Sequence, residues 1–209
     1  MRLLLSCIFM ATLGLLCAGQ TRPAATTPAA SEPAADFYGV QAPATRIVYI
    51  VDHSGSMLDN FDFVRKEVDR SVGRLVPLQF FGVVMVSEKA TSVMGNELVR
   101  ALPENKKKFS EALAHIRAEG QNDDMLPPFQ QAFEVAFKLK PQMIYFLTDG
   151  RFGKGLPGVI AKLNADHKVV INTVAFVSEE PEYKAVLKRI AKENGGKYVF
   201  VPEKTLKGK

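Results

Sequence analysis

Short runs of consecutive apolar residues alternate along the chain with longer segments in which apolar residues recur every three or four positions. A β-branched run such as 46–51 is typical of a strand that is buried on both faces of a sheet. The longer spacing, seen for Phe61, Val64 and Val68, is typical of an amphipathic helix. We therefore predict strands over 46–51, 78–86, 90–94, 143–147, 168–177 and 197–201. Helices are predicted over 61–75, 106–118, 128–138, 157–164 and 181–194.

This alternation of strands and helices predicts the fold class. Parallel strands need a crossover of helical length between them, and the crossover helices cover both faces of the sheet. The sequence therefore predicts an α/β fold with a doubly wound, mostly parallel central sheet. Ligands of such sheets bind beyond the carboxyl ends of the strands, where the strand order reverses.

The first 19 residues have a different composition. Arg2 provides a positive start, residues 3–16 are almost all apolar, and small residues follow Cys17. This pattern is typical of a secretory signal peptide, and the apolar run is shorter than the roughly 20 residues that cross a bilayer. Cleavage is favoured over an uncleaved membrane anchor. A lipid anchor at Cys17 is the second alternative, although Leu16 fits poorly the small-residue pattern expected before a lipidated cysteine. We predict an exported protein that is secreted or resides in the periplasm or cell envelope, free or membrane-tethered through its N-terminus.

Composition divides the rest of the chain. Residues 20–45 are rich in Ala, Pro and Thr and offer little to a core, which predicts a flexible linker. A folded domain is predicted over 46–202, and 203–209 form a short basic tail. With 47% hydrophobic and 23% charged residues, the composition is that of an ordinary globular protein.

Charge and cysteine content exclude several functions. Both cysteines, Cys7 and Cys17, lie in the predicted signal peptide, so a chain that starts near Gln20 has no disulfide, zinc-thiolate site or cysteine nucleophile. The formal net charge of +5 is a mild imbalance. The one compact basic run, at 106–108, opens a helical pattern without aromatic residues beside it, which predicts a solvated face and no nucleic-acid binding.

Oxygen-bearing side chains follow two of the predicted strands. Asp52 ends the first strand, and Ser54 and Ser56 follow it with Gly55 between them. Asp149 ends a later strand that is predicted to lie beside the first. Carboxylates, hydroxyls and waters are the ligands of hard divalent cations such as Mg²⁺. These residues therefore indicate a metal site at the carboxyl edge of the sheet.

The joint pattern resembles a known family. An Asp-x-Ser-x-Ser sequence at 52–56 after a buried strand, with Leu-Thr-Asp-Gly at 147–150 after another, is similar to the metal-ion-dependent adhesion site (MIDAS) of von Willebrand factor type A (vWA) domains. The resemblance covers residues 46 to about 202. It implies a monomeric domain in which Ser54 and Ser56 ligate Mg²⁺, Mn²⁺ or Ca²⁺ directly, while Asp52 and Asp149 act through bound waters and hydrogen bonds. It also implies a protein partner whose acidic residue completes the coordination of the metal.

One loop departs from the family pattern. The family's third loop ordinarily supplies a threonine, but residues 119–125 contain none. Asp123 is the position that matches best, with Asn122 as the rival. A third carboxylate changes the charge of the site from near neutral to about −1. Affinity for the metal should then rise, and attraction for an acidic partner should fall.

Three neighbouring residues have competing interpretations. His53 alternates with the site residues, so we expect it to point into the neighbouring structure, because Mg²⁺ prefers oxygen to imidazole. Asp59 could approach the metal loop, but a role near the start of the following helix is favoured. Arg151 could contact an anionic partner or neutralise the extra acidic residues, and the sequence does not separate these two roles.

Enzymatic functions fit the sequence poorly. A serine hydrolase elbow needs Gly two positions before its nucleophile, where Asp52 stands before Ser54. A phosphate-binding loop pattern is absent. We therefore predict no enzyme activity and a metal-dependent protein-binding domain. The alternative is a structural or interaction domain whose metal is permanent or unnecessary; a metal-dependent hydrolase ranks third, because it lacks a second carboxylate two residues after Asp52.

Overall fold

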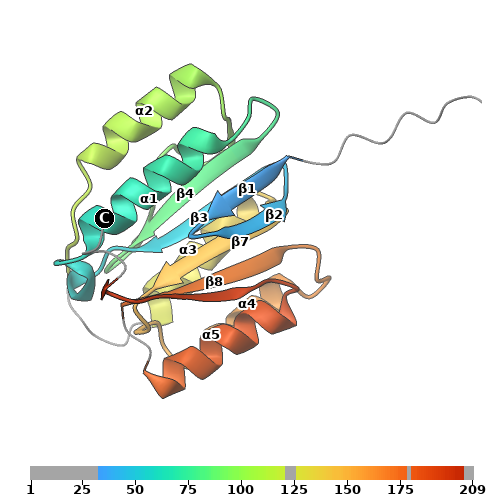
Figure 1. Cartoon of the computed structure of the whole chain (residues 1–209). Coiled ribbons are helices and arrows are strands. Elements are labelled where there is room, and N and C mark those ends of the chain that lie inside the picture. Colours follow the sequence, from blue (N-terminus) through green and yellow to red (C-terminus); the bar gives the residue numbers. More distant parts are fainter. Residues whose placement is uncertain (1–32, 121–125, 178–179, 205–209) are drawn as a thin grey trace, which may run out of the picture. The chain divides into compact units, whose positions relative to one another are not determined.

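The computed structural model describes residues 33–120, 126–177 and 180–204, which fold around a central β-sheet (Figure 1). The strand order is β5-β4-β3-β7-β8-β9, and β6 also pairs with β4. All neighbours are parallel except β5 and β6, which run antiparallel to β4. The strands are β3 (Arg46–Asp52), β4 (Phe80–Val86), β5 (Ala90–Ser92), β6 (Val99–Arg100), β7 (Met143–Thr148), β8 (Val170–Phe176) and β9 (Tyr198–Val201).

Helices cover both faces of this sheet (Figure 1). One face packs against α1 (Phe61–Arg74) and α2 (Pro103–Ala114). The other packs against α3 (Leu126–Lys138), α4 (Leu156–Leu163) and α5 (Pro181–Glu193). Alternate residues of the central strands enter the two cores; Tyr49, for example, faces α1 and Ile50 faces α3. The predicted doubly wound α/β fold is confirmed.

The predicted elements are present, with shifted ends. The helix predicted over 106–118 begins earlier, at Pro103, because proline suits the first helical position, where its missing N–H is not needed. It ends at Ala114, whose carbonyl oxygen accepts hydrogen bonds from the guanidinium groups of Arg65 and Arg117. The edge strand predicted over 90–94 is shorter and ends at Ser92. Strand β6 was not predicted.

The linker predicted over 20–45 is wrong for its last part. A β-hairpin forms from β1 (Ala34–Phe37) and β2 (Val40–Pro43) and covers the same face of the sheet as α1 (Figure 1). Its turn has positive φ at both Tyr38 (48°) and Gly39 (78°), as a two-residue type I′ hairpin requires. Phe37 is completely buried, so this segment belongs to the folded core.

Two tyrosines of the central strands hold the hairpin in place. The Tyr145 hydroxyl lies 3.1 Å from the carbonyl oxygen of Ala35 and 2.9 Å from that of Val40, and it donates toward both. The Tyr49 hydroxyl lies 2.8 Å from Ser71 Oγ, which donates to the carbonyl of Asp36. The hairpin backbone thus satisfies polar groups of β7 and α1 directly, and Ser71 satisfies the Tyr49 hydroxyl of β3, as buried polar groups need. Within the described ranges, no helix has the length and apolar character needed to span a membrane.

Candidate metal centre

The two predicted site carboxylates lie at a reversal of strand order. Asp52 is the last residue of β3, and Asp149 directly follows β7. These strands pair in parallel, with Val51 opposite Leu147. The next strand along the chain, β4, pairs with one edge of β3, whereas β7 pairs with its other edge. Their carboxyl ends therefore form the crevice in which open α/β sheets bind ligands.

The loop after β3 orders the first group of oxygen atoms. Ser54 N donates to Asp52 Oδ1 at 2.9 Å, so the carboxylate holds the turn that follows it. The chain then forms a short 3₁₀ turn, Gly55–Met57, which leads into α1. The hydroxyls of Ser54 and Ser56 lie 3.0 Å apart. Three of the predicted site residues are therefore together, with both hydroxyls on the same side of the loop.

Thr148 connects the two strand ends, a role that the sequence analysis did not assign. Its hydroxyl donates to Asp52 Oδ2 at 2.8 Å and accepts a hydrogen bond from Gly150 N at 3.1 Å. Thr148 is completely buried. A buried polar residue at the end of an otherwise apolar strand, directly before Asp149, is the signal that could have indicated this role.

Burial raises the pKa of both carboxylates of the site. Burial, followed by the negative charge of Asp149, raises the pKa of Asp52 to about 7. Burial also raises the pKa of Asp149, while hydrogen bonds from Ser56 and from the backbone N–H of Arg151 oppose the rise. Desolvation and a like charge both disfavour the ionised form. A cation bound between Asp52 and Asp149 would favour their ionised forms and so lower both pKa values.

One oxygen atom of the site lacks a partner. Asp149 Oδ1 is buried and has no hydrogen bond within the described part of the chain. A buried acceptor without a donor costs about 1–3 kcal/mol, and more for a charged group. The residues thus fit a hard divalent cation, since two carboxylates and two hydroxyls offer oxygen ligands and one carboxylate oxygen is unsatisfied. In the described ranges, no group of three or more His, Cys, Asp or Glu side chains could hold a metal, so the hydroxyls are needed to complete this donor set.

The described residues on either side of the third predicted loop have contacts with the two loops that carry the site. Glu119 N donates to the carbonyl oxygen of His53 at 2.9 Å. Leu126, where α3 begins, packs against Gly153, and a Cβ atom at Gly153 would lie only 2.8 Å from Leu126 Cα. Asp123 and its rival Asn122 lie outside the described residues, so the assignment of Asp123 as a ligand stays a prediction.

His53 points away from the candidate site. Its Nδ1 lies 2.9 Å from the carbonyl oxygen of Arg117, and its ring packs near Phe61 at 5.9 Å between centroids. It is 5% exposed, and burial lowers its pKa. The predicted structural role of His53 is confirmed.

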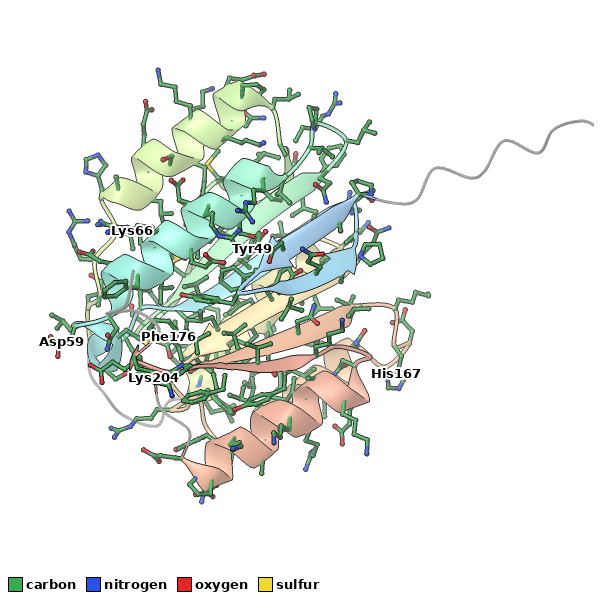
Figure 2. All side chains as sticks on the ribbon, viewed as in Figure 1. Tyr49, Asp59, Lys66, His167, Phe176 and Lys204 are labelled. Atoms are coloured by element: carbon green, nitrogen blue, oxygen red, sulfur yellow. The ribbon has the colours of Figure 1, made fainter. Side chains whose placement is uncertain are left out.

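The two charged neighbours of the site differ in their relation to it. Asp59 is exposed and points away from the sheet at the outer end of the β3–α1 loop (Figure 2), and no hydrogen bond or ion pair joins it to the other described residues of this loop. The backbone N–H and the positive charge of Arg151 oppose the rise that burial causes in the pKa of Asp149. This favours the interpretation that Arg151 offsets acidic charge at the site.

Comparisons with known proteins identify the family and the fold. A model of the von Willebrand factor type A domain family matches residues 47–207. A vWA protein from Catenulispora acidiphila is similar in structure at 20% identity and a TM-score of 0.63, covering 79% of this chain and 41% of its own. Proximal thread matrix protein 1 from the mussel byssus, in a form described as having a zinc-occupied MIDAS motif, matches at 20% identity and 0.58, covering 78% and 43%.

A third similar structure is an aerotolerance-related membrane protein from Bacteroides fragilis, at 16% identity and a TM-score of 0.58, covering 77% of this chain and 93% of its own. No curated protein sequence matches this chain. The chain spans less than half the length of the Catenulispora and mussel proteins. At these identities the structural likeness shows the fold, and the family model covers most of the chain. The chain therefore belongs to the von Willebrand factor type A domain family.

Proposed function

We propose that this vWA domain binds a divalent cation at Asp52, Ser54, Ser56 and Asp149 and uses it to bind another protein. The observation that carries the proposal is the buried Oδ1 of Asp149, which has no hydrogen-bond partner among the described residues and lies beside a second buried carboxylate. Protein interiors rarely leave an acceptor unsatisfied, and two like charges in one crevice are unfavourable without a counter-ion. Mg²⁺ is proposed first, with Mn²⁺, Ca²⁺ or zinc as alternatives in the metal assays.

The chain's own residues divide the work of holding this site. The hydroxyls of Ser54 and Ser56 face the same side and are proposed as direct ligands. Asp52 is held by Ser54 N and by Thr148, so it is oriented to accept hydrogen bonds from metal-bound water. When bound, the ion supplies a positive charge at the surface that attracts an acidic side chain of a partner. We assign no residue a catalytic role.

Calorimetric titration with Mg²⁺ and Mn²⁺ tests the metal site. We expect saturable binding that weakens about 10- to 100-fold in Asp52→Asn, because residues that orient metal ligands contribute that much affinity. Asp149→Asn should weaken it at least as much. Asp59→Asn is the matched control, since it removes a neighbouring exposed carboxylate and should leave the affinity unchanged. Absence of binding, or equal binding in Asp52→Asn, would refute the proposal.

Partner capture tests the interaction itself. The protein is used to retain partners from a native envelope fraction, with and without chelator. Loss of capture with chelator supports the proposal, whereas equal capture favours a domain that binds partners without a metal. Asp123→Thr tests the third loop: if Asp123 is a ligand, this variant should bind Mg²⁺ more weakly and an acidic partner more strongly.

We also propose that the protein is exported to the cell envelope. The support is the signal-like segment at 1–19 and the similarity to a membrane protein of Bacteroides fragilis. Fractionation of cells that express the full chain with a C-terminal tag tests export. Metabolic labelling with a fatty acid, compared between wild type and Cys17→Ser, separates a lipid anchor from a cleaved signal; a tag confined to the cytoplasm would contradict export.

A further inference from the structure

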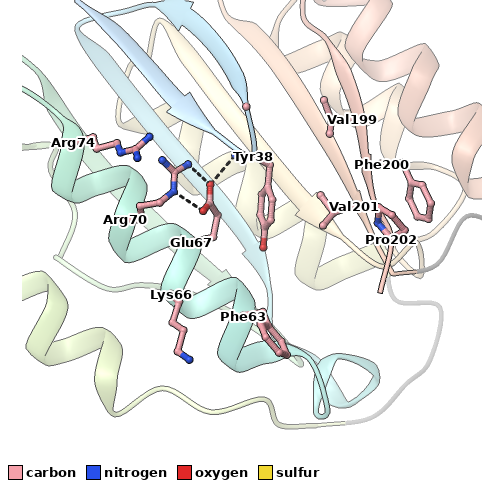
Figure 3. Close-up of a pocket in the computed structure, with 11 residues that line it drawn as sticks. Tyr38, Phe63, Lys66, Glu67, Arg70, Arg74, Val199, Phe200, Val201 and Pro202 are labelled. Atoms are coloured by element: carbon pink, nitrogen blue, oxygen red, sulfur yellow. Dashed lines mark hydrogen bonds and ion pairs between the residues drawn. The ribbon is translucent and has the colours of Figure 1, made fainter. Parts of the chain in front are cut away.

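A groove separates α1 from the edge strand β9 (Figure 3). Its volume is about 650 Å³. Phe63 and the cationic side chains of α1 line one side, and Val199 to Pro202 line the other. Tyr38, at the tip of the hairpin, lies between the two sides (Figure 3).

Strand β9 forms an open edge of the sheet. Within the described chain it pairs only with β8. Thr173 N donates to the carbonyl oxygen of Lys197, and Val177 N donates to that of Val201. Because backbone groups alternate in direction along a strand, Phe200 presents its N–H and C=O to the opposite edge. An open edge with these groups is a template for pairing with another extended chain.

Apolar side chains of β9 remain partly exposed at this edge. Tyr198, Val199 and Phe200 are half-buried, while Val201 is buried. Val199 lies on the α1 side, and Phe200 lies on the α5 side. An added strand would therefore find an apolar contact on each face of the sheet, at alternate residues.

The helix opposite carries a row of cations. Lys66, Arg70 and Arg74 are four residues apart, so they lie along one side of α1. Arg70 is paired with Glu67 and Asp36, and Arg74 is paired with Asp36. Lys66 has no ion pair within the described ranges, and Arg74 is 62% exposed. The groove therefore has a surplus of positive charge on its helical side.

Tyr38 contributes an unsatisfied hydroxyl. Its oxygen is buried and has no hydrogen-bond partner among the described residues, although its backbone N–H donates to Glu67 Oε1 at 2.8 Å. A bulky residue with positive φ is unfavourable by roughly 1–2 kcal/mol. The local sequence thus keeps an unfavourable backbone conformation that places this ring between α1 and β9.

We propose that this groove binds an extended acidic segment of a partner protein, which adds as a strand to the edge of β9. Backbone hydrogen bonds to Phe200 would set its register. Side chains on one face of the added strand would meet the cations of α1, and side chains on its other face would meet Phe200. The matching peptide therefore alternates acidic and apolar residues. This inference does not depend on the metal centre.

A second copy of the same chain is a poorer occupant. Pairing of two β9 edges would bring two rows of cations on α1 toward one another, and like charges in apposition are unfavourable. An acidic partner instead neutralises the row. Association should therefore weaken with ionic strength, because exposed charge pairs are screened by salt.

Nuclear magnetic resonance of the ¹⁵N-labelled domain tests the proposal. The probe is an end-blocked Thr-Glu-Val-Glu-Val-Glu-Thr peptide, titrated to millimolar concentration in the presence of chelator. We expect saturable shifts of the amides of 199–201. Lys66→Glu should weaken binding of the peptide about fivefold. The matched control is Lys107→Glu on α2, a charge reversal at a side chain that is 79% exposed, and it should leave binding unchanged.

Two modified peptides separate the contributions. Replacing each Glu of the probe by Lys should abolish binding, and methylating the backbone amides that face β9 should do the same. The proposal is overturned if no amide of β9 shifts, if the Lys peptide binds equally, or if backbone methylation has no effect. It is also overturned if binding is lost in Asp149→Asn, or if light scattering shows that the free domain is a dimer in which the β9 edge is protected from hydrogen exchange.

Discussion

Phe37→Ala should strongly destabilise the domain, although Phe37 lies outside the region in which the sequence predicted a fold. The side chain is completely buried. Its ring centroid lies 5.3 Å from that of Tyr49 and 5.5 Å from that of Tyr145. It therefore fills the space between the hairpin and the two central strands.

The expected loss follows from this packing. Replacing a fully buried Phe by Ala costs about 3–5 kcal/mol of unfolding free energy, through lost burial and the cavity that remains. For a domain of this size, each kcal/mol lowers the melting temperature by roughly 2–4 °C. We therefore expect a decrease of about 6–20 °C.

Urea unfolding of residues 20–209, followed by circular dichroism and tyrosine fluorescence, measures the loss; the chain has no tryptophan that would obscure the tyrosine signal. Gln41→Ala is the matched control, because Gln41 is exposed in the same hairpin and should change stability by less than about 0.5 kcal/mol. A loss below about 1 kcal/mol for Phe37→Ala, with an unchanged denaturant slope, would refute the reasoning. The hairpin would then contribute little to the unfolding free energy, as expected of a flexible linker.

Three further changes have expected outcomes. Gly153→Ala should lower the unfolding free energy by about 1–3 kcal/mol in urea unfolding, because φ is +78° and the new Cβ would lie 2.6 Å from Leu126 Cβ. Gly73→Ala is its helical counterpart and should raise stability by about 0.5–1 kcal/mol in the same assay, since a Cβ there meets nothing within 4 Å. In thermal melts with chelator, Asp149→Asn should raise the melting temperature, because it removes the charge that disfavours ionised Asp52. Added Mg²⁺ should then raise the melting temperature of the wild type only; a variant that responds equally would argue against the metal centre.

The parts of the fold that depend on local pattern were predictable. Buried parallel strands are continuous apolar runs, and amphipathic helices repeat their apolar positions, so β3, β7 and α1 could be identified without tertiary information. The position of Asp52 and Asp149 followed from the same reasoning, because both residues end such runs. Their closeness required only that β3 and β7 be neighbours, which the structure has.

The parts that depend on distant partners were not predictable. The hairpin residues Ala34 to Pro43 lie within the Ala-, Pro- and Thr-rich stretch 20–45. Their order comes from contacts with residues roughly a hundred positions away, such as Tyr145. The role of Thr148 likewise depends on Asp52, across 96 positions of sequence. In both cases the sequence contains the donating side chain, Tyr145 or Thr148, but it does not indicate which distant residue accepts the hydrogen bond.

The hairpin does not pair with β9 in the described part of the chain. It covers the face of the sheet above Tyr49 and Tyr145 on β3 and β7, and its turn ends at Tyr38, whose ring reaches Phe176 on β8 at 5.9 Å between centroids. The ion pairs of Asp36 with Arg70 and Arg74 hold it toward α1. Tyr38 and β9 line the same groove, but among the described residues β1 and β2 pair only with each other. The segment that completes the core of the sheet therefore leaves the outer edge of β9 without a strand partner among the described residues, as the proposed strand addition requires.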